Sequence, residues 1–454
     1  MLTKPPPFQK VLIANRGEIA LRIIRACHEL GIKTVAVHSK ADEDALHVKL
    51  ATQSVCIGPA LAKDSYLNIA SIMSAAVATR ADAIHPGYGF LSENAAFAEI
   101  CGSCGITFIG PTVRNMRVMG DKARARRVAD KVGVPTIPGD SKGLLDPAEA
   151  LKIAERTGFP ILLKACAGGG GRGMKIVKNA EGMVSTFQMA QREVEAAFGD
   201  GHLLVEKYLP RVRHIEVQVA GDQSHNVVHL GIRDCSVQRR YQKLLEESPS
   251  IGLPADLQNK IQDAAVELAK SVNYTSLGTV EFLVDLENKQ YFFIEMNTRL
   301  QVEHPVTEMV TDIDLVKEQI AIAGGSDLSV SQSEVRISGH AIEARINAED
   351  PRTMIPSPGL VKSYHPPGGN GIRVDSAVYA GYTVKPYYDS MISKIIVRDK
   401  DRESCIRKLL VALDEYLIDG ISTNIELHRR ILSHPDFRSG NFSTKFLEQV
   451  QLFG

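Results

Sequence analysis

The sequence predicts an α/β chain with three parts: a doubly wound parallel-sheet domain, a small subdomain around a glycine loop, and a C-terminal α+β domain. Apolar runs at residues 10–14 and 34–37 flank a helical pattern, which is typical of parallel sheets. Two strand-like runs, 159–164 and 174–177, enclose five glycines. From about residue 338, an alternating strand, turn-rich segments and an amphipathic helix near 402–417 indicate an antiparallel cap.

The first strand–helix–strand unit excludes one common nucleotide motif. Its helix repeats apolar residues at three- and four-residue spacing, at Ala20, Ile23, Ile24 and Cys27. Gly31 follows as the expected helix end. The turn before the helix, residues 15–18, lacks the phosphate-cradling glycines of dinucleotide-binding folds. The same pattern continues to a boundary near Gly110-Pro111, and the turn-rich segment 85–94 connects a strand to a helix within it.

The glycine loop of the second part predicts a flap over phosphates. Five glycines fall within residues 168–173, a density that weakens a sheet unless another backbone must approach closely. No Lys-Ser/Thr follows them, which excludes a Walker loop, and a strand follows instead of a dinucleotide-type helix. Bare amides and Lys164 could then meet phosphates. The alternative is a flexible hairpin without a chemical role.

Two further segments, residues 203–209 and 233–243, fit a nucleotide site less specifically. Residues 203–209 end an apolar strand where backbone groups could read an adenine edge, although an ordinary edge strand is equally compatible. Residues 233–243 concentrate cations beside hydrogen-bonding residues, and residues 122–131 form a basic helical pattern. Runs of charge usually lie on solvated faces, which is the simpler interpretation of residues 122–131, whereas residues 233–243 lie between strand segments.

A hairpin predicts the metal site. After a turn at residues 287–289, polar residues alternate with apolar ones, at Glu295, Asn297, Arg299, Gln301 and Glu303, which indicates an extended strand with one polar face. A three-residue loop would pair Leu286 with Gln290 and set Glu281 opposite Glu295. Two carboxylates about 5 Å apart repel by roughly 3 kcal/mol at an effective dielectric of about 20. A shared proton or a surface location is possible, but a hard divalent cation, with Asn297 as a third oxygen ligand, fits better.

Composition bounds the remaining possibilities. Lys plus Arg equals Asp plus Glu at 53 each, so no global field favours nucleic acid or an acidic membrane. No apolar run is long enough to span a bilayer, and we expect no signal or transit peptide. Seven dispersed cysteines favour reduced thiols in a cytoplasmic protein, and the lone Cys101-Gly-Ser-Cys104 is interpreted as structural.

Taken together, these segments resemble the biotin carboxylase family of the ATP-grasp superfamily, as found in acetyl-CoA carboxylase. The resemblance covers nearly the whole chain and lies in the motifs Ala14–Ala20, His85–Asn94, Ala167–Met174, Arg233–Arg240, Glu295–Arg299 and Gln301–Glu308. It implies an N-terminal domain over 1–115, an ATP-grasp domain over 116–330 with a lid at about 135–205, and a C-terminal domain over 331–454. It also implies ATP, two Mg²⁺ or Mn²⁺ ions and biotin carried on a separate protein.

The resemblance assigns roles to residues at matching positions. ATP would be bound by Lys122, Lys164, Gly170, Gly171, Glu206, Lys207, Tyr208, Leu209, His214, Gln238, Tyr241, Glu281 and Glu295. Of these, Lys122, Lys164, Gly170 and Gly171 would bind the phosphates. Residues 206–209 would frame the adenine, and His214 and Gln238 would lie beside the ribose. The metal ligands would be Glu281, Glu295 and Asn297. Bicarbonate would be bound by Lys243, Arg299, Gln301 and Val302. Glu303 would be the base and Arg345 the biotin-binding residue, which with Lys243 and Arg299 complete the catalytic set.

Two positions depart from the family. Tyr241 stands where many relatives have His, and Cys166-Ala167 stands where some have Ser-Gly, which stiffens the flap slightly.

The implied partners are a biotin carboxyl carrier protein, carboxyltransferase subunits and a second copy of this chain, since the sequence has no Met-Lys-Met acceptor hairpin. The acceptor stays open among acetyl-CoA, pyruvate and propionyl-CoA. Two other functions compete: an ATP-grasp ligase for a different carboxylate, and a nucleotide-binding subunit without turnover.

Overall fold

The parallel sheet at the N-terminus is covered on both faces, as predicted. The computed structural model describes residues 7–140, 142–166 and 174–453. Five strands lie in the order β3-β2-β1-β4-β5, and all their pairs are parallel. The elements of this part are β1 (Lys10–Ile13), α1 (Gly17–Glu29), β2 (Lys33–Ser39), η1 (Lys40–Asp42), α2 (Leu46–Leu50), β3 (Gln53–Gly58), η2 (Ala62–Asp64), α3 (Ile69–Thr79), β4 (Ala83–His85), α4 (Ala95–Ser103) and β5 (Thr107–Phe108).

Two apolar layers fix this sheet in the molecule. Ile19, Ile23 and Ile24 of α1 pack with Val11 and Ile13 on one face. On the other face, α3 and α4 contribute Ile72, Phe97 and Cys101. Cys101 is buried there, whereas Cys104 is exposed.

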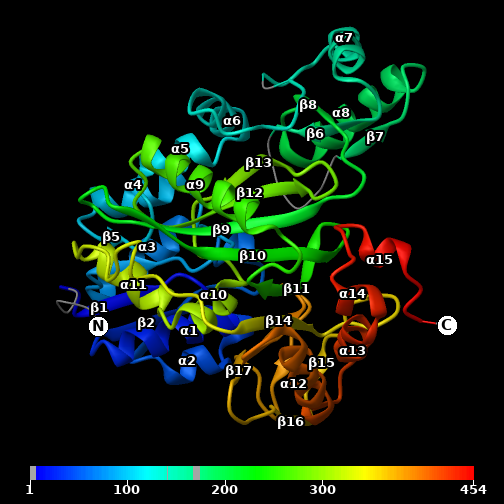
Figure 1. Ribbon diagram of the computed structural model, residues 1–454. Helices are drawn as coiled ribbons and strands as arrows, with labels where there is room; N and C mark the ends of the chain where they lie inside the picture. The colour runs from blue at the N-terminus through cyan, green and yellow to red at the C-terminus, as the bar shows by residue number, and fades with distance from the viewer. Residues whose placement is uncertain (1–6, 141, 167–173, 454) are drawn as a thin grey trace.

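An eight-stranded sheet forms the centre of the molecule, in the order β13-β12-β9-β10-β11-β14-β19-β17 (Figure 1). Its strands that precede residue 330 are β9 (Arg213–Gly221), β10 (Val227–Arg239), β11 (Gln242–Ser248), β12 (Ser276–Asp285) and β13 (Gln290–Asn297). The helices around them are α5 (Val113–Met119), α6 (Lys122–Lys131), α9 (Ala255–Ser271), α10 (His304–Thr311) and α11 (Leu315–Ala323). The basic pattern at residues 122–131 is therefore one helix, α6.

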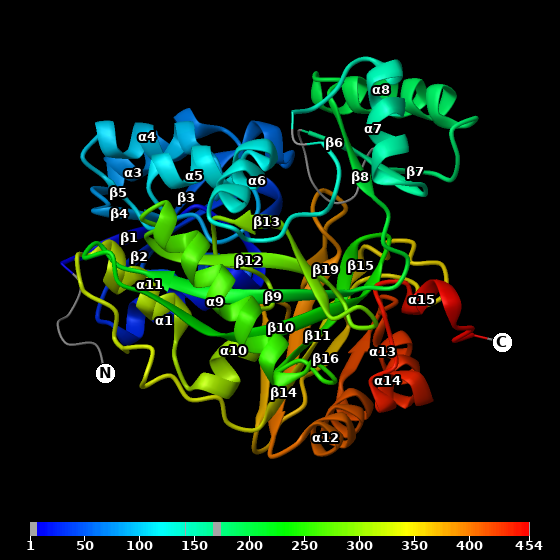
Figure 2. The same cartoon turned by 45° about the horizontal axis from the view of Figure 1, so that its top comes forward.

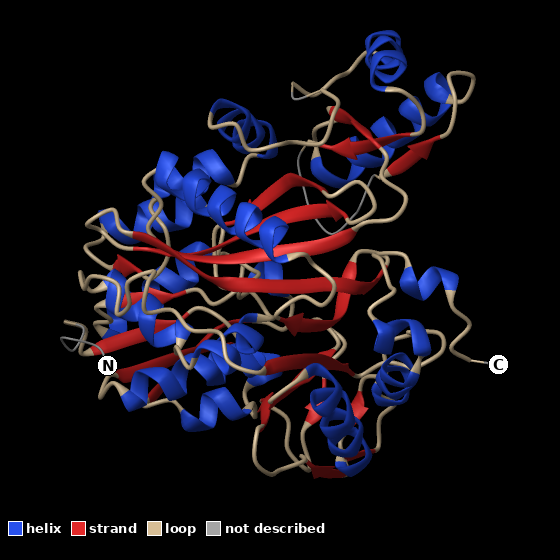
Figure 3. Ribbon diagram, viewed as in Figure 1, coloured by secondary structure: helices blue, strands red, loops and turns tan. Residues whose placement is uncertain are grey.

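The C-terminal segment is α+β, as predicted, but it is not a separate cap. Strand β14 pairs with β11, so the central sheet continues across the expected boundary at residue 330. The elements are β14 (His340–Asn347), β15 (Gly359–Leu360), β16 (Ser363–His365), β17 (Ile372–Ser376), β18 (Thr383–Val384), β19 (Met391–Asp399), α12 (Arg402–Glu415), β20 (Leu417–Asp419), α13 (Ile425–Ser433), α14 (Pro435–Ser439) and α15 (Phe446–Gln449). Figure 3 shows the strands and helices of this segment in separate colours, with the helices after β19 packed beside the strands.

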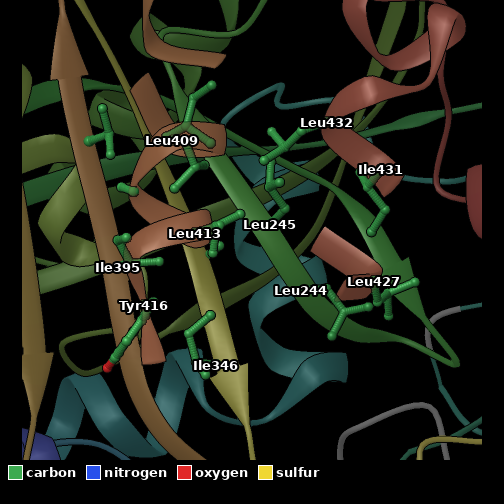
Figure 4. Close-up of a cluster of buried hydrophobic side chains, with 14 of the residues drawn as sticks. Leu244, Leu245, Ile346, Ile395, Leu409, Leu413, Tyr416, Leu427, Ile431 and Leu432 are labelled. Carbon is green, nitrogen blue, oxygen red and sulfur yellow. The ribbon is translucent and has the colours of Figure 1, made fainter. Parts of the chain in front are cut away.

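One hydrophobic cluster holds the C-terminal helices on this sheet. Leu409 and Leu413 of α12, with Ile431 of α13, meet Leu245 and Ile395 from the strands (Figure 4). All five side chains are buried. The opposite face of β14 is left for charged residues, which form the site described below.

The lid projects from the body as a small unit with its own core (Figure 2). It comprises α7 (Pro147–Thr157), β6 (Ile161–Ala165), β7 (Lys175–Val177), α8 (Met183–Phe198) and β8 (Leu203–Lys207). Its antiparallel sheet has the order β7-β6-β8. Gly170 and Gly171 lie outside the described residues, between β6 and β7. Across the described part of the chain, none of the helices combines the length and apolar character that a membrane crossing requires.

Candidate functional site

The predicted pairing of two acids across the β12–β13 hairpin is confirmed, but its predicted cause is wrong. Glu281 lies opposite Glu295, whereas Asp285, not Leu286, pairs with Gln290. The loop therefore has four residues, 286–289. A register shift between Glu281 and Phe282 adds one residue to β13, and this bulge restores the pairing that a shorter loop would have produced.

The alternation beyond Asn297 does not continue a strand. Strand β13 ends at Asn297, residues 298–302 form a loop, and Glu303 is the N-cap of α10. Pro305 explains this difference, because proline cannot donate to a strand ladder and is favoured in the first turn of a helix. Arg299, Gln301 and Glu303 thus reach the site from a returning loop rather than from a strand face.

This loop nevertheless returns to Glu281. Asn297 Nδ2 lies 2.5 Å from Glu281 Oε1, and Gln301 Nε2 lies 2.7 Å from the same oxygen. The Asn297 Oδ1 atom accepts from Arg299 Nη2 at 2.9 Å. Arg299 is held in turn by Glu93, whose Oε2 lies 2.8 Å from Nε. Burial opposes charge on Arg299, yet Glu93 outweighs it and raises the pKa of the guanidinium.

Strand β9 contributes His214, which was predicted to bind ATP, and Glu216, which the sequence prediction missed. His214 Nε2 lies 2.9 Å from Glu281 and 3.3 Å from Glu216, which is fully buried. Burial lowers the pKa of His214, but the two carboxylates prevail and raise it to about 9. The signal was present in the sequence: His214, Glu216 and Gln218 alternate with Ile215, Val217 and Val219.

Lys243 of β11 lies at the centre of three carboxylates. Its Nζ contacts Glu216, lies 2.7 Å from Glu303 Oε1 and 3.4 Å from Glu281 Oε1. Burial alone would lower the pKa of Lys243, whereas these acids raise it well above its usual value. Arg233, also missed as a site residue, contacts Glu216 at 3.2 Å and Gln301 at 2.6 Å. A largely buried cluster of charges requires such mutual pairing.

Arg345 of β14 completes the cluster from the C-terminal segment. Its Nη2 lies 2.9 Å from Glu303 Oε2, and its Nε donates to Glu246 Oε1 at 2.6 Å. Burial raises the pKa of Glu246 to about 7 despite Arg345. For Glu303 the balance is reversed: burial favours the neutral form, but Lys243 and Arg345 lower its pKa. Glu303 is therefore a carboxylate at neutral pH.

The predicted nucleotide residues form a second group beside the lid. Lys164 Nζ lies 2.7 Å from Glu206 Oε2, and Arg126 lies 3.3 Å from the other oxygen of Glu206. Lys207 instead donates to the carbonyls of Gly158 and Phe159 at 2.9 and 3.1 Å. Its ammonium therefore supports the lid backbone. The adjoining residues Tyr208 and Leu209 lie in the connection that follows β8.

Lys122 links the lid side of the site to the hairpin. Its Nζ lies 3.4 Å from Glu295 Oε2, at the first residue of α6. Burial would raise the pKa of Glu295, but Lys122 and Lys164 lower it. Gln238 is buried in β10 opposite Lys243. Tyr241 lies in the following turn, with φ +67° and 53% exposure, away from the carboxylate cluster.

The carboxylates of this site fit a hard divalent cation. Oxygens of Glu216 and Glu281 lie within 4.8 Å of each other, and Glu295 faces Glu281 across the hairpin. Carboxylate and amide oxygens with open positions are the ligands that magnesium takes when phosphate oxygens complete its shell. The arrangement can thus hold a metal–polyphosphate, bind an anion near Lys243 and Arg299, and remove a proton with Glu303.

Comparison with known proteins covers nearly the entire chain. The family models described as biotin carboxylase, N-terminal domain, carbamoyl-phosphate synthase L chain, ATP binding domain, and biotin carboxylase C-terminal domain match residues 7–116, 121–331 and 343–449. Biotin carboxylase 1 of Bacillus subtilis is 53% identical over 449 residues, which span 98% of this chain and 100% of the relative.

Two solved structures are similar throughout. The biotin carboxylase–beta-gamma-ATP complex from Campylobacter jejuni superposes with a TM-score of 0.96 at 49% identity, over 98% of this chain and 99% of the other. The biotin carboxylase domain dimer of Hydrogenobacter thermophilus 2-oxoglutarate carboxylase, in complex with MgADP, ADP and bicarbonate, has a TM-score of 0.94 at 50% identity, with 97% of each chain covered.

Proposed function

We propose, from the premise that the chain belongs to the biotin carboxylase family, that the cluster around Glu281, Glu303 and Arg345 is its active site. The enzyme is an ATP-dependent ligase of the ATP-grasp fold, which transfers the carboxyl group of bicarbonate to biotin through carboxyphosphate. The observation that supports the assignment best is the position of Glu303, with one carboxylate oxygen 2.7 Å from Lys243 and the other 2.9 Å from Arg345.

The nucleotide is assigned to residues of the hairpin, α6 and the lid. Lys122 and Lys164, with Gly170 and Gly171 of the loop, are proposed to hold its phosphates. Residues 206–209 are proposed to frame the adenine, with Gln238 and Tyr241 on the sugar side. His214 lies against Glu281, which supports a place for it near the phosphate end rather than the ribose.

The metal sites are assigned to Glu281, Glu295 and Asn297. Two magnesium or manganese ions there would neutralise the triphosphate and align its terminal phosphoryl group. The proximity of Lys122 and Lys164 keeps Glu295 ionised, as a metal ligand must be. Asn297 and Gln301, both within 2.7 Å of Glu281, orient that carboxylate toward its partner across the hairpin.

Bicarbonate is assigned to the space beside Lys243, Arg299, Gln301 and Val302. Glu303 removes the bicarbonate proton, and the freed oxygen attacks the γ-phosphorus of ATP as ADP leaves. Carboxyphosphate then breaks down to carbon dioxide and phosphate, and the lid excludes water meanwhile. Phosphate accepts the proton of the biotin ureido nitrogen, which attacks carbon dioxide while Arg345 stabilises the ureido oxygen.

The partners and compartment belong to the same proposal. Biotin is delivered on a carrier protein, and carboxyltransferase subunits consume the carboxybiotin. Two copies of the chain form a homodimer in the cytoplasm. Domains over 1–115, 116–330 and 331–454 stay predictions, supported by the nearby matched ranges. Acetyl-CoA is the proposed acceptor. The biotin carboxylase domain of a 2-oxoglutarate carboxylase is about as similar to this chain as the Campylobacter jejuni biotin carboxylase is, so similarity does not distinguish acceptors. Pyruvate and propionyl-CoA are the alternatives.

ATP turnover tests the proposal against its two rivals. Purified protein with ATP and Mg²⁺ should release ADP only when bicarbonate is present, and faster when free biotin is added. Turnover without dependence on bicarbonate would favour another ATP-grasp ligase. Nucleotide binding without turnover would favour a regulatory subunit.

A further inference from the structure

A fully buried lysine from the C-terminal segment contacts the loop of residues 298–302, which is proposed to bind bicarbonate. Lys394 of β19 has a side chain with 0% exposure, and its Nζ lies 2.7 Å from the carbonyl oxygen of Val302. In the sheet it stands opposite Arg345, on the neighbouring strand β14. Burying an ammonium beside another cation costs several kcal/mol unless its partners compensate, so this position needs an explanation.

The contact fixes the direction of one peptide group. The carbonyl of Val302 and the N–H of Glu303 belong to the same trans peptide, in which they point in opposite directions. Because Lys394 holds the carbonyl, the N–H of Glu303 points away from the C-terminal sheet. His304 fixes the preceding carbonyl similarly, with Nδ1 2.8 Å from the oxygen of Gln301.

The amides of this turn are available to an anion. Among the residues that the structure describes, neither the N–H of Val302 nor that of Glu303 has a backbone acceptor. Glu303 is the N-cap of α10, but its side chain does not cap the helix, since both its oxygens bind cations. These amides and the positive end of the helix dipole could therefore bind an anion on the side opposite to Lys394.

We infer that Lys394 is a positioning residue for bicarbonate: by holding the Val302 carbonyl, it aims the Val302–Glu303 amides and the Glu303 carboxylate at the bound anion. The inference rests on the proposed function and extends it to a residue that contacts neither substrate nor metal. It also explains why the site requires the C-terminal segment, which supplies both Arg345 and Lys394.

A purely structural role is the alternative. Lys394 Nζ also lies 3.5 Å from Glu18 Oε1 in α1, so it could simply join three parts of the chain. Glu18 contacts the hydroxyl of Tyr88 as well, and burial raises its pKa to about 7. Replacing Glu18 by Gln removes the ion pair with Lys394 but leaves the contact with Val302, which makes it a matched control.

The experiment compares Lys394→Met with Glu18→Gln in bicarbonate-dependent ATP cleavage. For Lys394→Met we expect KM for bicarbonate to rise by about tenfold or more, with KM for ATP within about twofold of the unmodified value. Glu18→Gln should keep both KM values within about twofold, even if it lowers the unfolding temperature comparably.

Three outcomes are distinguishable. An unchanged bicarbonate KM in folded Lys394→Met overturns the inference, as does an equal rise in Glu18→Gln. If Lys394→Met does not fold, Lys394→Gln, which keeps a donor on a shorter side chain, should raise KM for bicarbonate at least threefold, and an unchanged value again overturns it. Absence of bicarbonate-dependent cleavage in the unmodified protein contradicts the proposed function instead.

Discussion

Arg345 and Glu303 form an ion pair, 2.9 Å between Nη2 and Oε2, that joins the proposed biotin-binding residue to the proposed base. The other oxygen of Glu303 lies 2.7 Å from Lys243. Both cations stabilise the ionised form of this buried carboxylate. The proposed base for bicarbonate and the proposed stabiliser of the biotin oxyanion are therefore electrostatically coupled.

Replacing Glu303 with Gln should remove the base without changing its size. We expect kcat for bicarbonate-dependent ATP cleavage to fall by roughly 10²–10⁴-fold, with KM for ATP little changed. Glu343→Gln is the matched control, because burial raises the pKa of Glu343 well above its usual value and neither of its carboxylate oxygens has a hydrogen-bond partner among the described residues. It should lose no more than a few-fold. Equal losses in both variants would contradict the role of Glu303.

Replacing Arg345 with Lys should separate the two chemical steps. A lysine keeps one positive charge but cannot bind Glu246 and Glu303 while also meeting a biotin oxygen. Carboxybiotin formation should fall by about 10–100-fold, while bicarbonate-dependent ADP release without biotin falls much less. Parallel loss of both rates would place Arg345 in the first step instead.

Glu247 provides a test of the acid stability of the fold. It is buried against Arg402 at 2.6 Å and His340 at 2.8 Å. Burial favours its neutral form, but these partners prevail and lower its pKa from 4.5 to about 2. Because the folded pKa is the lower one, this stabilisation is complete above pH 4.5 and is lost as the pH falls from 4.5 toward 2.

The pair should thus contribute about 3 kcal/mol at neutral pH. Glu247→Gln should lower the unfolding temperature at pH 7 and make its decrease between pH 5 and pH 3 shallower. Thermal unfolding curves measured across this range check the prediction. If the unfolding temperature falls equally steeply with pH in both proteins, Glu247 is not responsible for the pH dependence.

The hydrophobic cluster in Figure 4 predicts that truncating a side chain of α12 lowers the free energy of unfolding only where that side chain is buried. Leu409 is fully buried, so Leu409→Ala should cost about 2–5 kcal/mol of unfolding free energy. Val411, on the same helix, is 65% exposed, and Val411→Ala should stay within about 0.5 kcal/mol. Denaturant unfolding of both variants measures the difference. A comparable loss in each would mean that helix propensity, not burial, dominates.

Local patterns predicted much of the fold but not its connections. The helix face of α1, the parallel sheet and the glycine loop between two strands follow from spacing and turn residues. The pairing of Glu281 with Glu295 was predicted from loop length, yet a longer loop and a bulge produce it. The pairing of β12 with β9 has no register shift, so the bulge lies in β13, and no residue of the hairpin sequence marks its position.

The site was predicted less completely because its centre is assembled from distant strands. Glu216 meets Arg233 and Lys243 from the two strands that follow it, and Glu246 meets Arg345 from β14, which is 99 residues further along the chain. Alternation in β9 marked Glu216 as inward-facing, but only the sheet order shows which cation it meets. Glu303 was expected on a strand, but it lies at the start of α10. Pro305, two residues later, is the sequence feature that indicated a helix start.

The central claim is that two facing acids bind metal–ATP so that it can activate bicarbonate for biotin. Its most direct measurement is the transfer of isotopic carbon from labelled bicarbonate to free biotin, in the presence of ATP and Mg²⁺, by the unmodified protein and by Glu295→Gln. The account predicts ATP-dependent labelled carboxybiotin from the unmodified protein and a loss of at least about tenfold in the variant. ATP consumption without labelled biotin, or an undiminished rate in Glu295→Gln, would contradict it.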